Sequence, residues 1–79
     1  MVKPTRITNT IRSLRFAHGE MTQAELARRL GVTRQTVIAI ERGRYSPSLE
    51  MAFRIARVFG VPLDDVFQYP DDEDRGETP

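Results

Sequence analysis

The residues with the clearest chemical content lie between Thr33 and Arg42. Read as a helix at about 100° per residue, this stretch turns Val37 and Ile40 to one side. The side chains on the opposite side are Gln35, Ile38, Ala39 and Arg42, with Arg34 at the margin. They supply an amide, guanidinium groups and small or apolar surface, and amide and guanidinium groups can each make two hydrogen bonds to one base edge. The stretch is therefore suited to enter a DNA groove.

A second predicted helix precedes this one and begins at Thr22. Thr22 and Glu25 form a T-x-x-E capping box, in which each side chain satisfies a backbone N–H of the other. A tight turn at Gly31 and Val32 ends this helix, since Gly31 can adopt the left-handed conformation. Thr33 then caps the following helix. The residues expected to face inward are Leu26, Ala27 and Leu30, while Arg28 and Arg29 point outward.

Three further helices are predicted around this pair. The first begins near Thr8 or Asn9 and runs to about His18, and Gly19 with Glu20 forms the turn that follows. Its apolar residues at helical spacing are Ile7, Ile11 and Leu14.

The other two helices follow the Arg44 to Pro47 loop. Ser48 caps a helix that reaches Phe59, and Pro62 suits the first turn of a short helix through about Phe67. Their apolar residues are Leu49, Ala52, Ile55, Ala56 and Phe59, then Leu63, Val66 and Phe67. No strand alternation or repeat is present, so we expect an all-α domain over residues 1–69. Residues 70–79 carry no apolar side chain to bury and are expected to form a disordered acidic tail.

The charge is divided unequally along the 79 residues. Residues 1–57 hold eleven Lys and Arg against four acids, a net charge of +7, whereas residues 58–79 have a net charge of −6. A basic body is typical of nucleic-acid binders, because each neutralised phosphate releases counterions. No stretch approaches the roughly 18 apolar residues of a membrane span. With no cysteine and no signal-peptide core, we expect a cytoplasmic protein, associated with the nucleoid when bound to DNA.

Catalytic and metal sites are not indicated. The sequence shows no nucleophile with a base, no phosphate loop and no metal-ligand set, so we expect no enzyme activity and no cofactor. His18 is the only histidine and has no neighbouring ligand cluster. The run from Asp71 to Asp74 lacks the spaced oxygen ligands of a calcium loop and indicates a solvated tail.

The sequence resembles the helix-turn-helix regulators of the Cro and phage-repressor type, also called the xenobiotic-response-element family. The matching segments are T-Q-x-E-L-A-x-x-L-G-V at 22–32, T-R-Q-T-V at 33–37, I-E-R-G at 40–43 and P-S-L at 47–49. The likeness covers roughly residues 8–68. The turn before Thr22 is one residue longer than the commonest family form, with Glu20 as the extra residue.

This resemblance implies a compact five-helix domain in which helix 33–42 lies in the major groove. By position, Arg34 and Gln35 match the base-reading residues of the family, suited to guanine and adenine respectively. Ala39 matches a position that often holds a longer base-reading side chain, so this chain would read fewer bases directly, with Ile38 beside it. Arg15 and Glu41 match a family pair that forms a salt bridge.

The resemblance also implies contacts with the DNA backbone. Gln23 matches a residue whose side chain meets a phosphate at the start of the second helix, where backbone N–H groups and the helix dipole favour an anion. The other phosphate-binding candidates are Thr33, Thr36, Arg42, Arg44 and Tyr45.

These observations predict a regulator, most simply a repressor, that binds a specific double-stranded DNA site as a homodimer, at least on DNA. Leu63, Val66, Phe67 and Tyr69 could be core or dimer contacts. An alternative is a protein-binding adaptor or antitoxin component with the same fold, which would contact a protein partner through its C-terminal helices or acidic tail.

Overall fold

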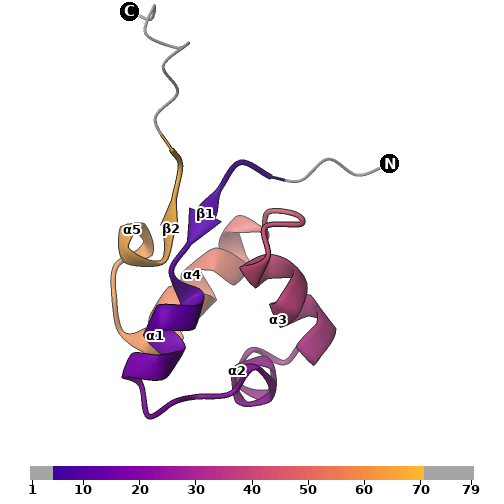
Figure 1. The fold of residues 1–79 in the computed structure, drawn as a ribbon, viewed down its shortest axis with the longest axis vertical. Coiled ribbons are helices and arrows are strands. Elements are labelled where there is room, and N and C mark those ends of the chain that lie inside the picture. The colour runs from indigo at the N-terminus through magenta and orange to yellow at the C-terminus, as the bar shows by residue number, and fades with distance from the viewer. Residues whose placement is uncertain (1–4, 71–79) are drawn as a thin grey trace, which may run out of the picture.

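Five helices and a pair of two-residue strands make up residues 5–70, the part of the chain that the computed structural model describes (Figure 1). The elements in chain order are β1 (Thr8–Asn9), α1 (Ile11–Ala17), α2 (Gln23–Leu30), α3 (Arg34–Glu41), α4 (Leu49–Phe59), α5 (Leu63–Val66) and β2 (Phe67–Gln68). The predicted five-helix architecture is confirmed. None of the helices in this range has the length and apolar character needed to cross a membrane.

The predicted N-terminal caps of α2, α3 and α4 are present. Thr22, Thr33 and Ser48 have extended backbone and accept a hydrogen bond from the backbone N–H three residues later, at 3.0, 3.2 and 3.0 Å. Each bond satisfies one of the donors that the first helical turn leaves without a partner. At the other ends, Gly31 and Gly60 have φ of 75° and 69°, the left-handed conformation expected of a terminating glycine.

The capping box predicted at α2 is only half formed. Thr22 caps the helix, but both carboxylate oxygens of Glu25 accept from Arg28 and Arg29 instead of reaching back to the backbone of Thr22. Two guanidinium groups on the same helix face are stronger partners for a carboxylate than one backbone N–H. The hydrogen bond from Arg29 is the main cause that holds the pKa of Glu25 below its ordinary value.

The core lies between the helices and takes its largest side chains from all five of them. The most deeply buried are Ile11, Leu26, Leu30, Val37, Ile55 and Val66. Val37 and Ile40 turn toward this core as predicted, at 1% and 3% exposure. Since these two residues anchor α3 on one side, its opposite side is left at the surface.

The N-terminal segment is extended where the sequence predicted a helix start. β1 pairs antiparallel with β2, with Thr8 opposite Gln68 and Asn9 opposite Phe67, and α1 begins only at Ile11. The helix start predicted near Thr8 or Asn9 is therefore too early, because these residues pair with a segment far along the chain, and this short pair of strands was not predicted. Asn9 still serves α1, since its Oδ1 accepts from the Ile11 N–H at 3.1 Å.

The C-terminal elements also differ from prediction in part. Leu49, one of the apolar residues at helical spacing, lies at the first position of α4 and is 67% exposed, unlike Ala52, Ile55, Ala56 and Phe59, which are buried. Phe67, expected to end the last helix, lies in β2. Val66 is fully buried and belongs to the core, whereas Tyr69 is exposed. The disorder was predicted for residues 70–79, of which 71–79 lie outside the described residues.

Candidate nucleic-acid interface

The side chains predicted to read bases lie along the outward side of α3. Arg34 and Gln35 occupy its first turn and are exposed, whereas Ile38 and Ala39, one turn later, are half-buried. The first turn of the helix therefore presents its polar groups most openly. The Thr33 cap precedes it, and its hydroxyl lies 3.1 Å from that of Thr36.

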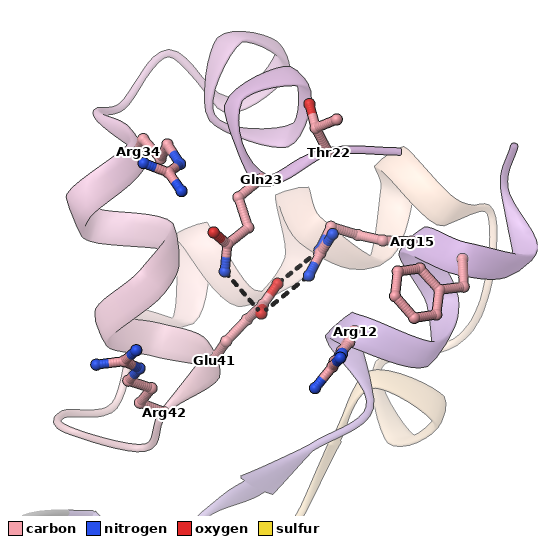
Figure 2. Close-up of a pocket in the computed structure, with 8 residues that line it drawn as sticks. Arg12, Arg15, Thr22, Gln23, Arg34, Glu41 and Arg42 are labelled. Atoms are coloured by element: carbon pink, nitrogen blue, oxygen red, sulfur yellow. Dashed lines mark hydrogen bonds and ion pairs between the residues drawn. The ribbon is translucent and has the colours of Figure 1, made fainter. Parts of the chain in front are cut away.

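Behind this face, Arg15 of α1 forms a bidentate ion pair with Glu41 of α3 (Figure 2). Arg15 Nε lies 2.7 Å from Glu41 Oε2, and Arg15 Nη2 lies 3.2 Å from Oε1. The two side chains are only 8% and 9% exposed. Arg15 Nη1 also donates to the carbonyl oxygen of Met21 at 2.8 Å, so one guanidinium joins α1, the segment before α2, and α3. The pair is therefore buried, and the small contribution to stability that is typical of exposed ion pairs does not apply to it.

The longer turn before α2 does not prevent Arg15 from reaching Glu41. Gly19 and Glu20 both have positive φ, 76° and 56°, and the Met21 N–H donates to the carbonyl oxygen of Arg15 at 2.8 Å. The extra residue is thus taken up in a left-handed turn, at some conformational cost for a residue with a Cβ. Arg15 keeps its position facing Glu41.

Gln23 lies in the first turn of α2 and is tied to the same carboxylate. Its Nε2 donates to Glu41 Oε1 at 3.2 Å, which uses one of the two N–H groups of the amide. The other N–H group remains for a further acceptor. The amide is thereby held at the start of α2, beside backbone N–H groups that favour an anion.

A groove of about 550 Å³ opens between α1, the start of α2 and α3 (Figure 2). Its lining residues are Arg12, Arg15, Phe16, Thr22, Gln23, Arg34, Glu41 and Arg42. Glu41 is the single acid among them and its charge is matched by Arg15. In residues 5–70, the remaining arginines of the groove, Arg12, Arg34 and Arg42, form no ion pair. The groove is therefore basic, and it adjoins the first turn of α3.

The structure brings together only some of the residues predicted to bind phosphate. Gln23 and Arg42 line the groove, whereas Arg44 and Tyr45 lie in the loop after α3, where both are exposed. Arg12 was missed by the sequence reasoning. Its spacing of three residues from Arg15 on a predicted helix was the available signal, because such residues share a face.

Comparison with known proteins identifies the family of the chain. A family model described as helix-turn-helix matches residues 11–66, from the start of α1 to the end of α5. The chain belongs to the helix-turn-helix family of the Cro and phage-repressor type. Members of this family bind DNA and regulate transcription, and this chain is a regulator of that class.

Similar proteins come from archaea and bacteria. The chain is 54% identical over 65 residues to an uncharacterized HTH-type transcriptional regulator of Methanocaldococcus jannaschii, which covers 82% of this chain and 97% of the relative. It is 38% identical over 56 residues to the cryptic phage transcriptional repressor RstR of Vibrio cholerae, covering 71% of this chain and 50% of RstR. The solved structure of a hypothetical transcription factor from Neisseria has a TM-score of 0.64 at 34% identity, over 70% of this chain and 61% of that one.

In this helix-turn-helix protein, α2 and α3 are the two helices of the motif and residues 31–33 are the turn. The Val32 N–H donates to the carbonyl oxygen of Ala27 at 3.0 Å, which closes the end of α2. From α4, Arg54 Nη2 donates to the carbonyl oxygen of Leu30 at 2.8 Å. Hydrogen bonds to α2 and from α4 thus hold the turn that leads to Arg34, the first residue of α3.

Proposed function

We propose that this helix-turn-helix regulator binds a specific site on duplex DNA by placing α3 in the major groove, and that it acts as a repressor. The observation that carries the proposal is the exposure of Arg34 and Gln35 in the first turn of α3, beside a groove whose uncompensated charges are all arginines. The N-terminal residues of a second motif helix are the ones that contact base edges in this mode of binding.

The base contacts follow from the chemistry of the side chains. Arg34 suits guanine, because its guanidinium can donate to both O6 and N7. Gln35 suits adenine, because its amide can accept from N6 and donate to N7. Ile38 and Ala39 are half-buried and offer only apolar contact, for example with a thymine methyl group. Direct readout is therefore narrow, and the shape and deformability of the DNA supply further discrimination.

Phosphate contacts would fix the register of α3 on the duplex. The second amide N–H of Gln23 is placed for this role at the start of α2, and Arg42 is placed at the end of α3. The remaining candidates are Thr33 and Thr36 at the start of α3, and Arg44 and Tyr45 in the loop after it.

Repression would be steric, since a protein bound over a promoter denies that DNA to polymerase. The similarity to a phage repressor of Vibrio cholerae supports this direction of regulation.

Two copies of the chain would bind half-sites about one helical turn apart, roughly 34 Å. A second copy also suits an apolar surface formed by Leu49 and Phe53 of α4, which are 67% and 51% exposed. Beside it lies a groove of about 290 Å³, lined mainly by Ile7, Pro47, Leu49, Ala52, Leu63 and Phe67. Because one surface offers both projecting side chains and a recess, two copies related by a two-fold axis could each fill the groove of the other.

Binding-site selection from random duplex DNA tests this function. The chain should enrich a motif with two-fold symmetry at two salt concentrations, and the variant with Arg34→Ala and Gln35→Ala should enrich none. Enrichment of the same motif by both proteins would show that another surface reads the DNA.

A further inference from the structure

We propose that Arg12 of α1 binds a phosphate of the DNA backbone at the groove between α1 and α3, and that the ring of Phe16 holds Arg12 in place for this contact. The inference rests on the proposed function, since it assumes that α3 faces DNA. It adds a contact from α1, outside the two helices of the motif.

The charges of the groove leave Arg12 available to an anion. Glu41, the single acid in the lining, already accepts hydrogen bonds from Arg15 and Gln23. Arg12 forms no ion pair with any acid in residues 5–70. A phosphate oxygen entering the groove would therefore find a guanidinium whose N–H donors are not committed to a carboxylate.

Phe16 gives Arg12 a fixed support. The Cζ atom of Arg12 lies 5.5 Å from the centroid of the Phe16 ring, and that of Arg15 lies 5.7 Å from the same centroid. Arg15 is immobilised by Glu41 and by the carbonyl oxygen of Met21, so the Phe16 ring lies against one fixed guanidinium group and can support the second. A cation held against an aromatic ring loses less freedom when it binds an anion than one on an unsupported side chain.

Phe16 lies at the surface and is not part of the hydrophobic core. The side chain is 54% exposed and lines the groove, while the core is filled by other residues. An exposed ring close to two arginines, in the lining of a basic groove, has the place and chemistry of a support for a DNA-binding cation.

The direction of the groove agrees with this role. Figure 2 shows Arg12 and Arg42 on either side of Glu41, with Arg34 at the far end of the same opening. A phosphate backbone that crosses the groove beside Arg42, at the C-terminal cap of α3, would thus meet Arg12 from α1. Arg42 and Arg12 would then neutralise different phosphates of the same backbone, while Arg34 reads a base.

The slope of binding affinity against salt concentration measures the contact. Arg12→Gln should make the slope of log K against log salt shallower by about one and weaken binding roughly tenfold, to the same extent on the selected site and on unrelated duplex. Arg57→Gln is the matched control, because Arg57 is exposed on α4, does not line the groove and changes the net charge equally. Arg12→Lys keeps a cation and should retain most of the slope.

A double-mutant cycle tests the role of Phe16 as a positioning residue. Phe16→Leu should weaken DNA binding severalfold in the parent chain and have no further effect in the Arg12→Gln variant. Thermal melts verify that the variants are folded, as expected for residues at the surface. If Phe16→Leu weakened binding equally in both backgrounds, the support assigned to the ring would be wrong.

Two results separate this inference from the proposed function. If Arg12→Gln gave the same slope and affinity as Arg57→Gln, while changes at Arg34 still abolished sequence discrimination, the groove contact would be refuted and the function of α3 retained. If changes at Arg12 and Arg34 all left DNA binding as in the parent chain, both would be refuted.

Discussion

Glu41 is the residue that joins the packing of this domain to the surface proposed to face DNA. Its carboxylate accepts from Arg15 at 2.7 Å and from Gln23 at 3.2 Å, which connects α1, α2 and α3. Because the Arg15 and Glu41 side chains are 8% and 9% exposed, loss of either would leave an uncompensated charge away from water.

Glu41→Ala should lower the free energy of unfolding by about 3 to 5 kcal/mol, since Arg15 would keep a buried charge without its partner. Urea titration followed by circular dichroism measures the change. The double variant with Arg15→Met and Glu41→Leu should cost less than Glu41→Ala alone, because both charges leave together. A loss below about 1 kcal/mol for Glu41→Ala would mean that the pair contributes no more than an exposed one.

Arg44 should behave as a phosphate contact, unlike Arg34, for which base reading is proposed. Arg44→Ala is expected to weaken binding by a similar factor on every duplex and to reduce the salt slope by about one. Fluorescence anisotropy at several salt concentrations provides both quantities, with Arg57→Ala as the control. A change confined to one base position of the site would assign Arg44 to base reading instead.

At the level of elements, the helices α2, α3 and α4 begin in the same way. In each, the hydroxyl group of the N-cap residue accepts a hydrogen bond from the backbone N–H three residues later. Ser48→Ala should lower the free energy of unfolding by about 1 kcal/mol, because the Met51 N–H loses its acceptor. Ser13→Ala, at an exposed position inside α1, is the control and should cost nothing. Equal effects of the two changes would show that the cap contributes no stability.

These caps explain why so much of the fold could be predicted from the sequence. Capping and glycine termination depend on residues at most a few positions apart, so Thr22, Thr33, Ser48 and Gly31 could be assigned from spacing alone. The pairing of β1 with β2 could not, because Thr8 meets Gln68 only when the whole chain has folded. The start predicted near Thr8 or Asn9 was therefore too early.

The candidate site divides in the same way. The exposure of Arg34 and Gln35 followed from the helical period of α3, which places Val37 and Ile40 in the core. The groove could not be predicted from this period, because its walls come from α1, α2 and α3 together. The spacing of Arg12 from Arg15 predicts only that the two share a helix face, and the roles proposed for Arg12 and Phe16 depend on the groove that the folded chain forms.

For the whole molecule, the apolar surface on α4 predicts how two copies would meet. Phe53→Glu should shift the protein toward the 9.1 kDa monomer in sedimentation velocity, because it places a charge where a second copy would pack. Arg57→Gln gives the same change in net charge and should leave the assembly unaltered.

The same Phe53→Glu protein should bind a full site less tightly and without cooperativity, while its preference for bases within one half-site stays the same. Unchanged sedimentation together with unchanged cooperativity would exclude this surface as the dimer contact.

The central claim is that sequence discrimination resides in the first turn of α3. The most direct measurement is the ratio of affinities for the selected site and a scrambled duplex of equal length, at one salt concentration, for the parent chain and for the variant with Arg34→Ala and Gln35→Ala. Each lost bidentate contact should remove about 1 to 3 kcal/mol of discrimination, so the ratio of the variant should fall by at least about tenfold while its binding to scrambled DNA changes far less. An unchanged ratio would contradict the claim, because the bases would then be read by another part of the molecule.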